Sequence, residues 1–312
     1  MVRENQSLVT EFFFQGLSSQ PRTQTVLFLV FLLFYLFTMV GNILIMTVVR
    51  SDCHLHSPMY FFLANLSFVD ICYISSHVPQ MLVNLLTKKM SISFSRCAAQ
   101  MYFALAFGMT ECVLLGVMAY DRYVAICHPL LYTTVMNRKV CILMVVASWT
   151  SSLLSSMVIS SLTLTLPFCR HDILNHYFCE VQALLAVACA DTSLMELLIF
   201  FFSILMLFIP FLLIIISYAR ILSTILKIQS AHLQYKTFST CGSHLLMVTM
   251  FYGTSICIYM NPMSRPSQDR DKVVALFYTI VVPMLNPLIY SLRNKDMKHA
   301  LRRAVNRPKS LL

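Results

Sequence analysis

Two carboxylic acids lie inside long apolar stretches of this sequence. Asp70 is the one acid in residues 57–87 and Glu111 is the one acid in residues 97–120, and neither stretch contains Lys or Arg. A carboxylate at the middle of a bilayer costs about 2.5–3.5 kcal/mol on insertion scales, so such an acid is a functional candidate. Three kinds of site fit the pair: a cation site, a proton-sensitive switch and a paired-acid protease. The alternative is a structural network with neighbouring amides and hydroxyls.

A second polar group follows the stretch that contains Glu111. Residues 118–129 read MAYDRYVAICHP. Arg122 is a planar, permanently charged cation at the expected membrane boundary, and it can bind carbonyls or carboxylates in a fork. Asp121 beside it is a natural restraint. An arginine that is restrained in one state and released in another is the kind of bistable element that a switch needs. The alternative is a basic anchor at the inner membrane surface.

The cysteines divide by the side of the membrane on which they are expected. Cys97 opens the third apolar stretch, and Cys169, Cys179 and Cys189 fall in the long connection after the fourth. These four face the oxidising side, where disulfides persist. Four cysteines allow three pairings, and their spacing does not choose among them. The other seven of the eleven cysteines lie in the bilayer or the cytosol and are expected to stay reduced.

The composition requires that these residues be positioned by helices in lipid. Of the 312 residues, 58% are hydrophobic and 12% are charged, against about 25% charged in a typical soluble domain. This balance excludes disorder, a collagen-like chain and a nucleic-acid module. About 20 apolar residues span a bilayer. Five further stretches without Asp, Glu, Lys or Arg are long enough to do so, which brings the expected spans to seven: residues 26–49, 140–169, 197–219, 237–264 and 273–292.

The basic residues indicate the orientation of the seven spans. With the C-terminus inside, the inner segments contain 14 of the 23 Lys and Arg residues and 3 acids, and the outer segments contain 9 basic residues and 8 acids. This asymmetry follows the positive-inside rule. It predicts an outer segment 1–25 with a glycosylation acceptor at Asn5, a bundle over 26–292 with a second outer loop at about 163–196, and an inner tail 293–312. Met297, Leu301, Ala304 and Val305 share one face of the tail, so we expect a short amphipathic helix at the inner surface.

Several motifs, in this order along the chain, resemble those of one receptor family. The run MAYDRYVAICHPL resembles the third-helix signature of rhodopsin-like G-protein-coupled receptors in its odorant-receptor form. The resemblance covers nearly the whole chain and indicates a class II, tetrapod-type odorant receptor with an all-α, seven-helix fold. The other matching segments are GN at 41–42, LHSPMYFFL at 55–63, SY at 217–218, KTFSTCGSHL at 236–245 and PMLNPLIYSLRN at 283–294.

The resemblance assigns roles to the residues described above. It implies the disulfides Cys97–Cys179 and Cys169–Cys189, and it matches Asp70 and Glu111 to the sodium-pocket acids of the family. The expected inner switch consists of Asp121, Arg122, Tyr123, Tyr218 and Tyr290. The resemblance further implies a multi-pass protein of the plasma membrane that binds a small volatile odorant and couples to the olfactory stimulatory G protein, with cyclic AMP as the product downstream. No cofactor is implied except an allosteric sodium ion.

The ligand is expected in the outer half of the bundle, above the acid pair. Helical spacing from Glu111 and the offsets of the family together give an apolar, sulfur-rich set that contains a few hydroxyls and no fixed charge. Such a set suits a small, weakly polar volatile, although ordinary helix packing explains each member nearly as well. The expected ligand-binding residues are Met101, Ala104, Leu105, Gly108, Met109, Phe202, Met206, Tyr252, Ser255, Tyr259 and Thr279.

The mechanism and its competitors follow from the same features. An odorant that binds better to a state with an open inner face shifts the population toward that state, and Pro210 and Pro287 supply places where the fifth and seventh spans bend. The segment His176–Glu180 resembles a loop suggested elsewhere as a metal site, but a disulfide-bonded Cys179 would not be a thiolate ligand. A transporter, a membrane enzyme and a same-fold receptor for a non-odorant molecule are the alternatives. The sequence contains no evident nucleophile with its base, and we expect no catalytic residues.

Overall fold

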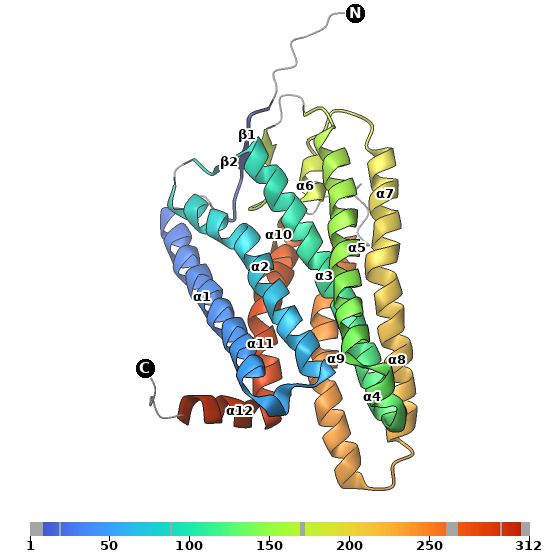
Figure 1. The fold of residues 1–312 in the computed structure, drawn as a ribbon. Coiled ribbons are helices and arrows are strands. Elements are labelled where there is room, and N and C mark those ends of the chain that lie inside the picture. The colour runs from blue at the N-terminus through green and yellow to red at the C-terminus, as the bar shows by residue number, and fades with distance from the viewer. Residues whose placement is uncertain are drawn as a thin grey trace, which may run out of the picture.

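The seven expected spans form one helical bundle (Figure 1). The computed structural model describes residues 9–18, 20–87, 89–168, 172–259, 268–293 and 295–306. Six helical segments in these ranges are long and apolar enough to cross a membrane, and α9 (Ala231–Tyr259) is the seventh helix of the bundle. The predicted seven-helix fold is therefore confirmed. The six are α1 (Pro21–Ser51), α2 (Pro58–Leu86), α3 (Phe94–Cys127), α5 (Arg138–Leu164), Ser193–Ile225 and Lys272–Tyr290.

Two of the spans are interrupted by a π-helical turn. The fifth consists of α7 (Ser193–Ser203), the turn η3 (Ile204–Phe208) and α8 (Ile209–Ile225). The seventh consists of α10 (Gln268–Leu276), the turn η4 (Phe277–Val281) and α11 (Val282–Arg293). Each turn ends two residues before a proline, Pro210 in the fifth span and Pro283 in the seventh. Proline lacks the N–H that would close the helical ladder, and π-turns are one of the ways in which a helix accommodates that loss.

The carbonyls that the prolines of the seventh span leave without a helical donor find donors on other helices. Pro283 cannot donate to the carbonyl of Thr279, and His77 Nε2 on α2 donates to it instead, at 3.3 Å. Pro287 cannot donate to the carbonyl of Pro283, and Asn42 Nδ2 on α1 lies 3.5 Å from that oxygen. Unpaired buried carbonyls are costly, so these two contacts connect the seventh span to α1 and α2.

A small sheet covers the outer end of the bundle (Figure 1). Strand β1 (Glu11–Phe14) lies between the antiparallel β2 (Ser91–Ser93) and the parallel β3 (Ile173–Leu174). Alternate residues of a strand face opposite sides, so Phe12 and Phe14 are buried, and the ring of Phe12 packs edge-on against Phe168. No strand was predicted within residues 1–25. The first span was expected to begin at residue 26, whereas α1 begins at Pro21, a residue type suited to a first helical position.

The inner end carries the short helices that connect the spans. The first connection contains the 3-10 helix η1 (Cys53–Leu55), and the second contains η2 (Pro129–Leu131) and α4 (Tyr132–Val135). Helix α12 (Lys295–Asn306) lies across the inner end of α1 and α11 (Figure 1). Met297 and Ala300 on α12 are buried against the bundle, and Lys298 and Arg302 are exposed. The predicted amphipathic C-terminal helix is confirmed.

Candidate functional site

A cavity of about 100 Å³ lies between α3, the fifth span, α9 and the second outer loop. On α3, Met101, Leu105, Met109 and Cys112 line it, and they are spaced three or four residues apart because such residues share one helix face. Gly108 on the same face leaves space, since its nearest neighbour is Tyr73 Cε2, 3.9 Å from where a Cβ would be. The other lining residues are Tyr73, Ala104, Phe178, Cys179, Glu180, Val181, Phe202, Ser203, Met206, Leu207, Phe251, Ser255 and Tyr278.

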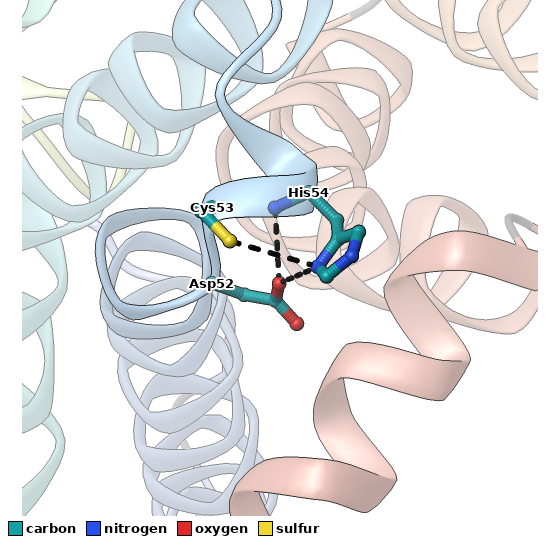
Figure 2. Close-up of side chains that lie close together, drawn as sticks. All are labelled: Asp52, Cys53 and His54. Atoms are coloured by element: carbon teal, nitrogen blue, oxygen red, sulfur yellow. Dashed lines mark hydrogen bonds and ion pairs between the residues drawn. The ribbon is translucent and has the colours of Figure 1, made fainter.

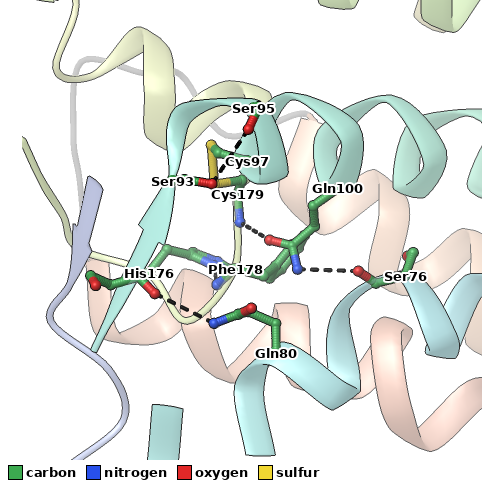
Figure 3. Close-up of a disulfide and its surroundings, with 10 residues drawn as sticks. Ser76, Gln80, Ser93, Ser95, Cys97, Gln100, His176, Phe178 and Cys179 are labelled. Atoms are coloured by element: carbon green, nitrogen blue, oxygen red, sulfur yellow. Dashed lines mark hydrogen bonds between the residues drawn. A yellow bond between two sulfur atoms is a disulfide. The ribbon is translucent and has the colours of Figure 1, made fainter. Parts of the chain in front are cut away.

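A disulfide holds the outer wall of the cavity against α3 (Figure 3). Cys97 near the start of α3 is bonded to Cys179 in the loop, which confirms this predicted pair. Gln100, one turn further along α3, accepts a hydrogen bond from the backbone N–H of Cys179 at 2.8 Å and donates to the carbonyl of Ser76 at 3.2 Å. The loop residues on both sides of Cys179 are thereby fixed over the cavity.

The same loop is bonded to the seventh span. Thr279 donates its hydroxyl proton to the carbonyl of Ala275 at 2.7 Å, so Tyr177 Oη is the donor in its 3.0 Å hydrogen bond to Thr279 Oγ1. One residue earlier, Tyr278 Oη donates to Glu180 Oε1 at 3.4 Å. Glu180 Oε2 lies 3.4 Å from the buried His176 Nε2. Two adjacent residues of η4 therefore hold the loop across the opening between α3 and the seventh span.

Deeper in the bundle, the two acids lie among amide side chains. Asp70 and Glu111 are both buried, and Asn286 on α11 donates to Asp70 Oδ2 at 2.8 Å. Five buried oxygen atoms of this group accept no hydrogen bond from a described residue: Asp70 Oδ1, both carboxyl oxygens of Glu111, Asn286 Oδ1 and Asn42 Oδ1. Buried oxygens are normally hydrogen-bonded, and hard cations take oxygen ligands. The donor set of this group therefore fits a small hard cation.

The predicted switch residues lie together at the inner ends of α3, α8 and α11. Arg122 is buried, and Asp121 accepts a hydrogen bond from Tyr132 Oη at 2.8 Å. Tyr218 on α8 is bonded to His244 on α9, with 2.9 Å between Oη and Nδ1. Tyr123 Oη lies 3.0 Å from His128 Nε2. Tyr290 is buried, and its hydroxyl has no hydrogen-bond partner among the described residues.

Comparison with known proteins decides which family uses this arrangement. A sequence profile of olfactory receptors matches residues 31–307. Olfactory receptor 5AR1 of Mus musculus is 49% identical over 307 residues, which are 98% of this chain and 99% of the relative. Olfactory receptor 2D2 of Homo sapiens is 50% identical over 303 residues, covering 97% and 98% of the two chains. Olfactory receptor 5G3 of Homo sapiens is 49% identical over 312 residues, covering 100% and 99%.

The chain belongs to the olfactory receptor family. It is therefore a G-protein-coupled receptor of the odorant class and a multi-pass protein of the plasma membrane, as its spanning helices require. Members of the family are receptors and not enzymes, so the protease, enzyme and transporter hypotheses no longer apply.

Eight of the eleven residues predicted to bind the odorant line the cavity of this olfactory receptor. The lining residues do not include Tyr252, whose ring stacks on Phe211 and whose hydroxyl donates to the carbonyl of Cys112 at 2.9 Å. Nor do they include Thr279, which binds Tyr177. The side chain of Tyr259 lies outside the described residues. The eight are Met101, Ala104, Leu105, Gly108, Met109, Phe202, Met206 and Ser255.

The second outer loop contributes to the cavity, which was not predicted from the sequence. Phe178, Glu180 and Val181 all line it. A signal for this was present, because a bond between Cys97 and Cys179 necessarily brings the neighbours of Cys179 to the outer end of the third span. Glu180 also changes the chemistry, since the predicted set contained no fixed charge.

Two predicted modifications of the receptor cannot be placed. Asn5, the predicted glycosylation acceptor, lies outside the described residues. The second predicted disulfide joins Cys189 to Cys169, and Cys169 also lies outside them. Both remain predictions.

A group of potential metal ligands at the inner end has a structural explanation (Figure 2). Asp52 Oδ1 caps η1 by accepting from the backbone N–H of His54 at 3.1 Å, and it lies 2.9 Å from His54 Nδ1. Arg303 on α12 donates to the other carboxyl oxygen, at 2.6 Å from Nη2 and 3.1 Å from Nε. The hydrogen bonds from Arg303 and from His54 hold the pKa of Asp52 far below its usual range. Both oxygens already have partners, and the group connects the first inner loop to α12.

Proposed function

We propose that this receptor binds a small, mostly apolar odorant in the cavity under the second outer loop and activates the olfactory stimulatory G protein, which raises cyclic AMP. The observation that carries the ligand assignment is the cavity itself, which is lined by Met, Phe, Leu and Val side chains with a few hydroxyls. Ligand pockets with this balance hold their ligands mainly by shape, and their few polar groups orient the ligand. Its volume of about 100 Å³ favours a molecule of only a few heavy atoms.

The proposed mechanism is a shift between two packings of the inner ends. The contact between Tyr218 and His244 joins α8 to α9 beside the buried Arg122. An odorant that fits the cavity better when the inner end of α9 has moved outward favours that state by its difference in affinity and by no more. The movement separates Tyr218 from His244 and exposes Arg122 to the G protein. The π-turn η3, which contributes Met206 and Leu207 to the cavity wall, is an irregular segment of the same span that contains Tyr218.

A sodium ion is proposed to bind at the acid pair, because the buried oxygen atoms of this group fit a small hard cation. Asp70, Glu111 and Asn286 would hold it, with Asn42 beside them. When bound, the ion supplies a positive charge that compensates the buried acids. A sodium titration of the unfolding temperature of the purified receptor tests this proposal. We expect sodium to stabilise the receptor more than potassium does and Asp70→Asn to remove the difference. An equal response to both ions would contradict it.

The coupling is tested by measuring cyclic AMP in cells that express the receptor with the olfactory stimulatory α subunit and display its N-terminus at the surface. We expect a dose-dependent rise with at least one member of a broad panel of small volatiles. Arg122→Ala should abolish the rise, and Arg138→Ala, which removes an exposed basic residue near the same surface, should leave it unchanged. An unaltered response in surface-positive Arg122→Ala cells would refute the switch. A response that requires an inhibitory α subunit would refute the coupling.

A further inference from the structure

Gly108 in the cavity wall is a glycine that the backbone of α3 does not require. It lies in the middle of this helix, which runs without a proline from Phe94 to Cys127. The glycine with a positive φ among the described residues is Gly16, so Gly108 has a conformation that any residue adopts. Glycine in a helix interior is less stable than alanine, because it loses more conformational freedom on folding. The position therefore gives up stability without a backbone reason.

Close helix packing explains another glycine of α3 but not this one. A Cβ on Gly116 would lie 3.1 Å from Pro210 Cβ, so Gly116 lets the fifth span approach α3. A Cβ on Gly108 would have Tyr73 Cε2 of α2 as its nearest described neighbour, at the ordinary contact distance of 3.9 Å. An alanine therefore fits at this position without displacing a described atom. The missing side chain leaves space, and that space belongs to the cavity, because Gly108 and Tyr73 both line it.

This part of the cavity wall is more rigid than the rest. Met101, Met109 and Met206 also line the cavity, and the rotatable bonds of methionine let such side chains move aside for a ligand. A Cβ has no rotamer, since its place is fixed by the helix backbone. That backbone is held by the packing of α3 against α2, α5 and α8 and, at its outer end, by the disulfide of Cys97. A methyl group at position 108 would thus occupy a volume that a ligand does not regain by rearranging its surroundings.

The cavity is small enough for one methyl group to change what it holds. Its volume is about 100 Å³. Each CH2 group of a ligand that becomes buried strengthens binding about fourfold. The methyl group of an alanine at position 108 is close in size to one such CH2 group. Filling the space beside Gly108 should therefore shorten the best-fitting ligand.

We propose that Gly108 is a specificity-determining residue that sets the upper size limit of the odorant and restricts it to neutral molecules with a short aliphatic chain. In this assignment the chain lies across the backbone of Gly108, on the side of the cavity that Tyr73 lines. The proposal rests on the proposed function in one respect, namely that the cavity is the odorant site. It goes further by naming the residue that limits the ligand and the kind of ligand that it admits.

The experiment measures the binding of linear alcohols, from propan-1-ol to octan-1-ol, to the purified full-length receptor. A hydroxyl both donates and accepts, so this head group suits the hydroxyls of Ser203 and Ser255 in the cavity wall. Dissociation constants are obtained from the dependence of the unfolding temperature on alcohol concentration. In the wild type, each added CH2 group should strengthen binding about fourfold until the cavity is full. Longer alcohols should then bind more weakly, so the affinity has a maximum at one chain length.

Gly108→Ala should move this maximum to a shorter alcohol. The alcohol that binds the wild type best should bind the variant roughly 5- to 100-fold more weakly, because the cavity is then overpacked. Propan-1-ol, which leaves the space beside Gly108 empty, should change by less than about fourfold, the effect of one CH2 group. Gly108→Ser adds an oxygen to the same methyl group, and its maximum should lie at a chain length no longer than that of Gly108→Ala.

Gly253→Ala is the matched control. A Cβ on Gly253 meets no described atom within 4 Å, and this residue lies on the exposed face of α9 and not among the lining residues of the cavity. Both changes replace a helical glycine by alanine where the methyl group has space, so both should raise helix stability alike. Gly253→Ala should therefore keep the wild-type maximum. Effects of the alcohols on the detergent cancel, because every variant is measured in the same detergent.

Five results would overturn the assignment. They are the same maximum in the wild type and Gly108→Ala, an equal shift in Gly253→Ala, a wild-type affinity that still rises at octan-1-ol, no binding of any alcohol to the wild type, and a Gly108→Ala receptor that fails to fold or unfolds below the wild type. The last would show that the space beside Gly108 does not exist. Failure of the proposed function is seen independently, in the cyclic AMP response to the volatile panel and its dependence on Arg122.

Discussion

The strongest test of the packing concerns Gly41 on α1. A Cβ at this position would lie 2.8 Å from Pro287 Cγ and 2.9 Å from Pro287 Cβ, closer than carbon atoms approach without displacement. The obstacle is a proline ring inside α11, which has no rotamer that moves it away. Gly41→Ala therefore requires α1 and α11 to separate, and the separation also weakens the contact of Asn42 with the carbonyl of Pro283.

The size of the stability loss in Gly41→Ala is found by comparison with Gly253→Ala. A Cβ on Gly253, on the exposed face of α9, meets no described atom within 4 Å. Gly to Ala in a helix interior contributes about 1 kcal/mol of stability, and this gain is common to both positions. The difference between the two variants is therefore the overpacking cost alone, about 1–3 kcal/mol. The rigid ring of Pro287 favours the upper part of that range.

The assay is the apparent unfolding temperature of each purified receptor at one heating rate, together with its surface level in cells. Gly253→Ala should equal or exceed the wild type, and Gly41→Ala should fall several degrees below it and reach the surface less. Gly116→Ala, whose Cβ would lie 3.1 Å from Pro210 Cβ, should fall between them. Equal stability of Gly41→Ala and Gly253→Ala would refute the close contact between Gly41 on α1 and the ring of Pro287 on α11.

Three other predictions concern the outer loop. Thr279→Val removes the acceptor of Tyr177 and leaves the buried hydroxyl of Tyr177 unmatched, at a cost of about 1–3 kcal/mol in the free energy of unfolding. In a double-mutant cycle of unfolding free energies, the effects of Tyr177→Phe and Thr279→Val should therefore not add. The pKa of His176 is lowered from 6.5 to about 3 in the folded receptor. The unfolded chain therefore binds the proton more tightly, and stability is lost as the pH falls from 6.5 toward 3. His176→Gln should flatten the dependence of unfolding temperature on pH over that range. Cys97→Ser removes the disulfide to Cys179, which joins residues 82 apart in the sequence. The loss should cost about 2–5 kcal/mol of stability and greatly reduce surface expression. A surface level equal to that of the wild type would contradict the role given to this disulfide.

The sequence allowed prediction of what depends on helical periodicity. The α3 wall of the cavity follows from counting turns from Glu111, because α3 is a regular helix without a proline, and all five residues counted there line the cavity. The disulfide between Cys97 and Cys179 depended on the resemblance to the family, since the spacing of four cysteines allowed three pairings. The strand β1 was not foreseen, because residues 11–14 acquire their order by pairing with segments far away in the chain.

On the seventh span, the offset taken from the family indicated a residue that does not line the cavity. The predicted contact was Thr279, and the residue that lines the cavity is Tyr278. Both lie in the π-turn η4, where the extra residue of the wider turn changes the side-chain direction relative to an α-helix. The side-chain directions in this turn therefore differ from those of a regular α-helix. The proline at 283 was visible in the sequence, but the manner in which the helix accommodates it was not.

The π-turn that displaced Thr279 from the cavity also gives it a different position in the molecule. Its hydroxyl accepts from Tyr177 of the outer loop, and its carbonyl, which Pro283 cannot engage, accepts from His77 of α2. The adjacent Tyr278 donates to Glu180 in the cavity wall. Tyr278 and Glu180, which both line the cavity, thus belong to one hydrogen-bonded group with the loop, α2 and the seventh span, and the same span continues to Asn286, which binds Asp70, and to Tyr290. Movement of η4 cannot leave these contacts unchanged, since each depends on a fixed direction of one of two consecutive residues. The irregular turn, which the helical pattern of the sequence does not reveal, is therefore the element that connects the cavity wall and the outer loop to the span that contains Asn286 and Tyr290.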